Sequence, residues 1–125
     1  MPHPANITPD EDEAHILDSI DRFLERDVKP VVHDLEAADK YPREIADKLA
    51  ALGLYGATIS PDYGGLGLSA FTYVKIVERV SAVWMSVSGI FNAHLIMAAA
   101  VERFGTDEQK RQWLPRFASG ELMGG

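Results

Sequence analysis

A stretch of 21 residues without a charged side chain, residues 81–101, constrains the fold of this chain more than any other feature. A Glu-Arg pair closes it on either side. Its length would suit a bilayer crossing of about 20 apolar residues. However, Asn92, His94, Gly89 and three serines lie within it and disfavour a membrane span. We therefore expect no membrane span, but a central buried helix that amphipathic segments surround on nearly all sides.

The other segments carry helical signals. Apolar residues recur at 3.6-residue spacing, and each segment has recognisable start and stop residues. The 125 residues are enough for one domain with a buried core. We expect an all-α fold, a helical bundle of about five to six helices around the central helix. The start signals are the capping boxes at residues 8–11 and 106–109 and the N-cap Ser69, and the stop signals are Gly53, Gly105 and Gly120.

Four places interrupt the helical pattern. Pro30 should kink or break the first helix, residues 54–59 read as a short extended run, and the three glycines in residues 64–67 predict a tight loop. A helix unbroken from residue 69 to 104 would be about 54 Å long, against a domain diameter of roughly 35 Å. We therefore expect a break within residues 84–89, which are the weakest helix formers there.

Composition excludes several classes of function. The net charge is −7 and the isoelectric point is about 4.9, which argues against nucleic acid and anionic membranes as partners. The chain has no cysteine, so it has no disulfide, thiolate nucleophile or cysteine-based metal site. The N-terminal segment, residues 1–7, is short and polar and has no secretory or transit pattern. We therefore expect a cytoplasmic protein.

The sequence shows no catalytic apparatus of its own. Residues 65–70 match the letters of a dinucleotide-binding turn, but no strand leads into them and no acidic residue follows at the required distance, so a structural turn is favoured. The four histidines form no metal-ligand pattern, and we predict no metal site. His94 is more typical of a hydrogen-bonded core residue than of a catalyst.

One pattern on the central helix points to a ligand. Ser88, Asn92 and Ile96 are spaced four residues apart, and Gly89 lies beside them, so small and polar groups align along one side of an apolar helix. The pattern has two interpretations. It is either a close helix–helix contact with Asn92 bonded to a neighbour, or the wall of a mainly apolar ligand pocket.

A set of motifs in the chain resembles the N-terminal helical domain of the acyl-CoA dehydrogenase family. The resemblance covers nearly the whole chain, in order and with similar spacing. Its motifs are Tyr41-Pro42, Leu52-Gly53-Leu54, Pro61-Asp62-Tyr63-Gly64-Gly65-Leu66-Gly67, His94, Phe104-Gly105-Thr106-Asp107-Glu108-Gln109-Lys110, Leu114-Pro115 and Gly120-Glu121.

This resemblance implies a flavoenzyme that uses FAD to oxidise an acyl-CoA to its trans-2-enoyl product. It also implies an electron-transfer flavoprotein or similar acceptor, and a homo-oligomer, dimer or tetramer, for the full-length enzyme. The helix matching residues 86–104 lines the acyl-chain pocket in the family. Alignment through Gly105-Thr106 then implies that the substrate-binding residues are Ser88, Gly89, Asn92 and Ile96.

In the family, a β-domain holds most of the flavin and a C-terminal helical domain carries the catalytic glutamate. Neither matches any part of residues 1–125, so we expect a single N-terminal domain from a longer protein and assign no catalytic residue. The cofactor-binding residues stay unassigned. The alternatives are a related acyl-CoA oxidase, a flavin-dependent monooxygenase, or a free-standing helical interaction module without chemistry of its own.

Overall fold

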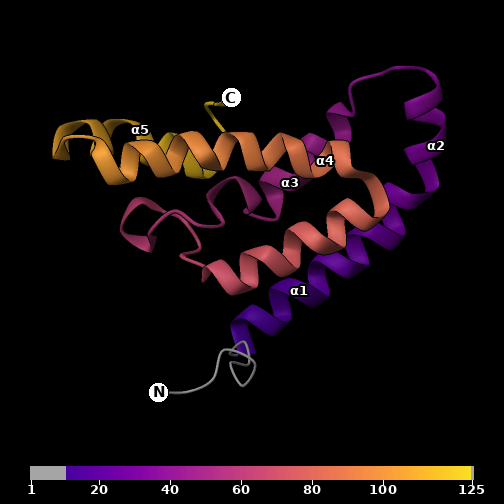
Figure 1. The fold of residues 1–125 in the computed structure, drawn as a ribbon, viewed down its shortest axis with the longest axis horizontal. Helices are drawn as coiled ribbons and strands as arrows, with labels where there is room; N and C mark the ends of the chain where they lie inside the picture. Colours follow the sequence, from indigo (N-terminus) through magenta and orange to yellow (C-terminus); the bar gives the residue numbers. More distant parts are fainter. Residues whose placement is uncertain (1–10, 125) are drawn as a thin grey trace.

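The computed structural model describes residues 11–124, and within that range every regular element is helical (Figure 1). This confirms the expected all-α fold. The predicted capping box at residues 8–11 depends on residues 8–10, which lie outside the described residues. The elements are α1 (Glu11–Phe23), the π-helical turn η2 (Leu24–Val28), α2 (Lys29–Ala37), α3 (Arg43–Ala51), the 3₁₀ turns η3 (Leu54–Gly56) and η4 (Pro61–Tyr63), α4 (Ala70–Phe104) and α5 (Asp107–Ser119).

The first helix does not break at Pro30 but widens just before it. The π-turn η2 joins α1 to α2, and the Lys29 N–H donates to the Leu24 carbonyl five residues earlier. A proline ring clashes with the carbonyl four residues before it and offers no N–H to it. A widened turn directly ahead of Pro30 relieves that clash, so the helix continues past a proline that was expected to kink or break it.

Residues 54–59 are not extended as predicted. Gly53 adopts a left-handed φ of 80° after α3, and the chain then coils through η3, burying Leu54 and Ile59. The following loop folds back on this coil. The Leu66 and Leu68 N–H groups donate to the carbonyls of Gly56 and Ala57 at 2.8 and 2.9 Å. Burial and this backbone pairing outweigh the local preference for an extended strand.

Helix α4 breaks where the sequence predicts. Trp84 has the non-helical angles φ −157° and ψ 103°, and the two halves of α4 meet at an angle in Figure 1. Ser69 caps the start of α4 by accepting a hydrogen bond from the Thr72 N–H at 3.1 Å. The first half of α4 lies against α1. Arg79 on α4 forms an ion pair with Asp21 on α1 at 3.0 Å.

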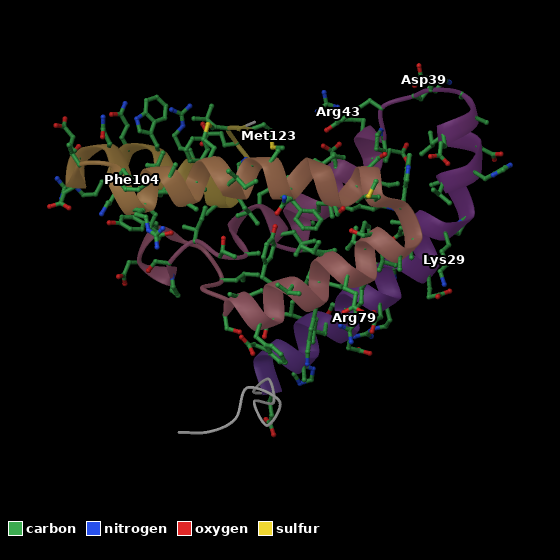
Figure 2. All side chains as sticks on the ribbon, viewed as in Figure 1. Lys29, Asp39, Arg43, Arg79, Phe104 and Met123 are labelled. Carbon is green, nitrogen blue, oxygen red and sulfur yellow. The ribbon has the colours of Figure 1, made fainter. Side chains whose placement is uncertain are left out.

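The central helix is less buried than expected. Val74, Met85, Ile96 and Phe104 are 61 to 82% exposed, and Figure 2 shows Phe104 at the outer end of α4. By length and composition α4 could also cross a bilayer, a property that core helices of soluble proteins share. The short helices around α4 cover one side of it, so the predicted enclosure on nearly all sides is wrong for the described residues.

Helix α5 closes the covered side of α4. Its capping box is complete, because the Gln109 N–H donates to Thr106 Oγ1 at 3.1 Å and Gln109 Oε1 accepts from the Thr106 N–H at 2.9 Å. Gly120 ends α5 with a left-handed φ of 81°. Beyond it the chain turns back over α4, so that Met123 lies beside that helix (Figure 2).

Candidate functional site

An exposed, mainly apolar surface runs along the second half of α4. We call it the open face and define it by residues on one side of that helix: Met85, Gly89, Asn92, Ala93 and Ile96. Met85 and Ile96 are 74% and 64% exposed. A Cβ added at Gly89 would meet no described atom within 4 Å. The open face therefore offers apolar surface and room, and no described element packs at Gly89.

Ser88 belongs to the break in α4 rather than to the open face. Its side chain is 6% exposed. The Ser88 hydroxyl donates to the Met85 carbonyl at 2.6 Å and accepts from the Ser81 hydroxyl at 2.9 Å. The bond from Ser81 spans the non-helical residue Trp84, and the bond to Met85 pairs the first carbonyl after it. Among the four residues predicted to bind substrate, the structure brings Gly89, Asn92 and Ile96 to one surface and places Ser88 at its inner edge.

Asn92 is held from inside by a tyrosine that sequence spacing could not find. The Tyr73 hydroxyl donates to Asn92 Oδ1 at 2.6 Å. The Tyr73 ring is half-buried and meets Phe91 edge-on, with ring centroids 6.3 Å apart. Burial raises the pKa of Tyr73 to about 12, so the hydroxyl stays protonated at neutral pH. Tyr73 precedes the break and Asn92 follows it, and helical periodicity does not carry across a break.

The opposite side of the same helix is fully packed. His94 is completely buried, its Nε2–H donates to the Phe117 carbonyl at 2.8 Å, and its Nδ1 accepts from the Gly124 N–H at 3.0 Å. The rings of Tyr55 and Phe117 meet it edge-on. Burial lowers the pKa of His94, which favours the neutral ring that these two bonds require. His94 is thus a core residue, as predicted.

Two hollows lie elsewhere, between the first helix and α3, with volumes of about 590 and 440 Å³. Arg26, Asp27 and Lys48 line both. Lys48 donates to Asp27 at 3.0 Å, and this hydrogen bond holds the pKa of Asp27 below its usual value. The hollows are wide and bordered by side chains that already pair with one another.

Neither a metal centre nor a phosphate loop is present in residues 11–124. No cluster of three or more metal-ligating side chains occurs there. The glycine loop packs on its own chain, since a Cβ at Gly65 would lie 2.0 Å from the Ile59 carbonyl oxygen. That glycine is required for close backbone approach, as a structural turn demands, and leaves no cradle for a dinucleotide.

Comparison with known proteins places this geometry in a family. The family model described as "Acyl-CoA dehydrogenase, N-terminal domain" matches residues 10–121. The chain is 36% identical over 115 residues to the (2S)-methylsuccinyl-CoA dehydrogenase of Cereibacter sphaeroides, covering 91% of this chain and 21% of that protein.

Solved structures show the same fold. A glutaryl-CoA dehydrogenase from Mycobacterium smegmatis superimposes with a TM-score of 0.81 at 30% identity, covering 95% of this chain and 30% of that one. A chain from the structure of the electron-transferring flavoprotein of Acidaminococcus fermentans gives a TM-score of 0.85 at 29% identity, covering 94% and 31%. This chain spans less than a third of the length of each of these three proteins. With the match over residues 10–121 and the shared helical fold, the chain belongs to the acyl-CoA dehydrogenase N-terminal domain family.

Proposed function

We propose that this chain is the N-terminal helical domain of an FAD-dependent acyl-CoA dehydrogenase, which oxidises an acyl-CoA to its trans-2-enoyl product. The open face of α4 forms part of the acyl-chain pocket, with Gly89, Asn92 and Ile96 on its wall and Ser88 behind it. One observation carries the proposal. In a domain of this family, an apolar helix face keeps a glycine over empty space, where packing within the domain gives no reason for one.

The open space at Gly89 also weighs against the alternative interpretation, a close helix–helix contact. Such contacts select small residues because a neighbouring backbone approaches them. Apart from the adjoining backbone of α4 itself, no described atom lies within 4 Å of a Cβ at Gly89, whereas a Cβ at Gly56 would touch Ala118 at 3.1 Å. Gly56 is therefore a packing glycine, and Gly89 has the properties of a pocket glycine.

Binding of the cofactor FAD requires segments of the full-length enzyme other than this domain. Residues 11–124 contain no dinucleotide cradle, since the glycine loop is filled by the Ile59 carbonyl. Most contacts to the flavin would come from the β-domain that the family resemblance implies. FAD supplies the hydride acceptor when bound, and the part of this chain is to hold the acyl group and exclude water from it.

Partners follow from the same assignment. The substrate is an acyl-CoA, and the electrons leave through an electron-transfer flavoprotein or a similar acceptor. The related proteins act, by their names, on methylsuccinyl-CoA and glutaryl-CoA, so the family accommodates different acyl groups. A homo-oligomer in the cytoplasm completes the proposal for the full-length enzyme.

Filling the space at Gly89 tests the pocket. In the full-length enzyme, Gly89→Leu should lower kcat/KM for long acyl-CoAs and spare short ones, because each methylene pushed out of an apolar pocket costs about 0.8 kcal/mol. Flavin reduction would be measured across an acyl-CoA length series, with melting temperatures alongside. As a control, Ala82→Leu, at another exposed small residue in the first half of α4, should leave the length profile unchanged.

The outcomes separate the candidate functions. An unchanged length profile with a lowered melting temperature would remove the pocket and restore the helix contact. Failure of every acyl-CoA to reduce the flavin would reject the dehydrogenase. A stoichiometric FAD complex of the isolated 125 residues would contradict the proposal that other domains hold most of the flavin. A gene encoding nothing beyond Gly125 would support the interaction module.

A further inference from the structure

The hydrogen bond between Tyr73 and Asn92 uses one end of a part-exposed amide and leaves its nitrogen without a partner in the described chain. These residues are 19 positions apart, which would separate them by about 28 Å in a straight helix. The break at Trp84 brings them within 2.6 Å. The contact therefore depends on the bend in α4, and it holds the Asn92 side chain against the first half of that helix.

The direction of this bond determines what Asn92 presents outward. The Tyr73 hydroxyl donates to Asn92 Oδ1, and no other acceptor in residues 11–124 takes the Tyr73 proton. Oδ1 faces Tyr73, so the amide nitrogen, with its two N–H donors, is the end of the side chain that has no partner in the described chain. No group in the described chain accepts from that nitrogen.

The surroundings of this amide are apolar. Gly89 lies about 60° away around the helix and Ile96 about 40°, so all three share one side. Ile96 is largely exposed, and the space at Gly89 is empty. A hydrocarbon chain lying along this surface would cover the two N–H donors without bonding them, which weakens binding. A chain with an acceptor atom at that depth would bond them.

We propose that Asn92, oriented by Tyr73, donates a hydrogen bond to a polar group at the distal end of the acyl chain. The preferred substrates are then acyl-CoAs with an acceptor far from the thioester, such as a carboxylate or hydroxyl, rather than plain fatty acyl-CoAs. Tyr73 is a positioning residue. This inference rests on the proposed dehydrogenase function and adds the substrate class to it.

The test uses the FAD-loaded full-length enzyme and sets of acyl-CoAs with the same number of carbons. Each set holds a plain acyl-CoA, its ω-carboxylate and its ω-hydroxy counterpart, over a series of lengths. At one length the wild-type enzyme should reduce its flavin with kcat/KM about tenfold or more in favour of the polar members, as is typical when a site is built to bond a substrate group. Most of the preference should lie in KM.

Variants assign that preference to the two side chains. Asn92→Leu should abolish it, and Tyr73→Phe should reduce it several-fold because the amide is then free to rotate. Asn92→Asp should reject the ω-carboxylate, by like-charge repulsion, while still accepting a hydrogen bond from the ω-hydroxy substrate. The matched control is Tyr55→Phe, since Tyr55 is another tyrosine whose hydroxyl donates a hydrogen bond within the chain, to the Ala46 carbonyl at 3.0 Å, on the far side of α4. It should leave the preference unchanged.

The results distinguish this inference from the function beneath it. Equal kcat/KM for plain and polar members at every length would overturn the substrate class and leave the dehydrogenase standing. A Tyr73→Phe enzyme with the wild-type preference would overturn the positioning role. If Asn92→Leu does not fold, Asn92→Asp carries the same decision. Flavin that no acyl-CoA reduces would overturn both the function and this inference.

Discussion

The two sides of the second half of α4 differ in what their polar residues bond to. His94 uses both ring nitrogens within the chain and has no exposed surface. Asn92, two residues earlier and about 200° around the helix, has one end bonded and the other free. Both are polar residues in the same apolar stretch, so composition does not separate them. His94 therefore has the bonding of a structural residue, with every polar atom paired within the chain. Asn92 has an unpaired amide nitrogen that can bind a partner from outside the described chain.

Removing His94 should produce the largest effect. His94→Ala leaves the Phe117 carbonyl and the Gly124 N–H without partners and opens a cavity between two aromatic rings, which should lower the unfolding free energy by about 2–4 kcal/mol. Urea unfolding of the chain would measure it. The matched change Asn92→Ala should cost only about 1 kcal/mol, because it removes the single hydrogen bond from Tyr73 and the amide nitrogen has no partner to lose. Equal losses would erase the difference between the two sides.

Acid should weaken the closed side by a smaller amount, since it affects one of the two His94 bonds. Burial lowers the pKa of His94 in the folded chain, so the unfolded chain binds the proton more readily. Stability from this group is therefore complete above the unfolded value of about 6.5 and falls as pH drops below it. The pH dependence of the urea midpoint would show this slope. In a His94→Gln chain, which cannot titrate there, this part of the slope should vanish.

The smallest expected effect lies on the open side and has the opposite sign. Gly89→Ala should stabilise the chain by about 0.5–1 kcal/mol, because alanine is the better helix former and nothing obstructs its methyl group. Thermal unfolding would detect the shift. Gly65→Ala is the control for steric space and should destabilise, because its Cβ would collide with the Ile59 carbonyl. A destabilising Gly89→Ala would mean that this side is packed.

Sequence patterns predicted the parts of this molecule that depend on local chemistry. The break at Trp84, the caps at Ser69 and Thr106, and the core position of His94 all follow from residue type and short-range spacing, and the structure confirms them. The coil at residues 54–59 was missed because its burial and its bonds to the following loop are tertiary effects. The exposure of α4 was missed because a pattern of apolar residues does not say which neighbours cover them.

The candidate site was predicted only in part, because local spacing finds residues on one helix face but not contacts across the break. Helical spacing found Gly89, Asn92 and Ile96, but assigned Ser88 to the same stripe, although the break turns its hydroxyl to the bonds with Ser81 and Met85. Tyr73 was out of reach, since its contact with Asn92 exists only through the bend. Whether these residues bind substrate stays a prediction.

The π-turn η2 shifts the angular phase of everything that follows it in the first helix. One extra residue per turn rotates α2 by about 100° relative to an uninterrupted helix. A helical wheel drawn without that shift aligns Val31 with Leu24 on the inner side, yet Val31 is 36% exposed and Val32 is the valine that packs on the core. Alignment of this segment with a relative that lacks the turn therefore needs a one-residue gap within residues 24–28. Without the gap, Val31 would be assigned to the inner face that Val32 occupies.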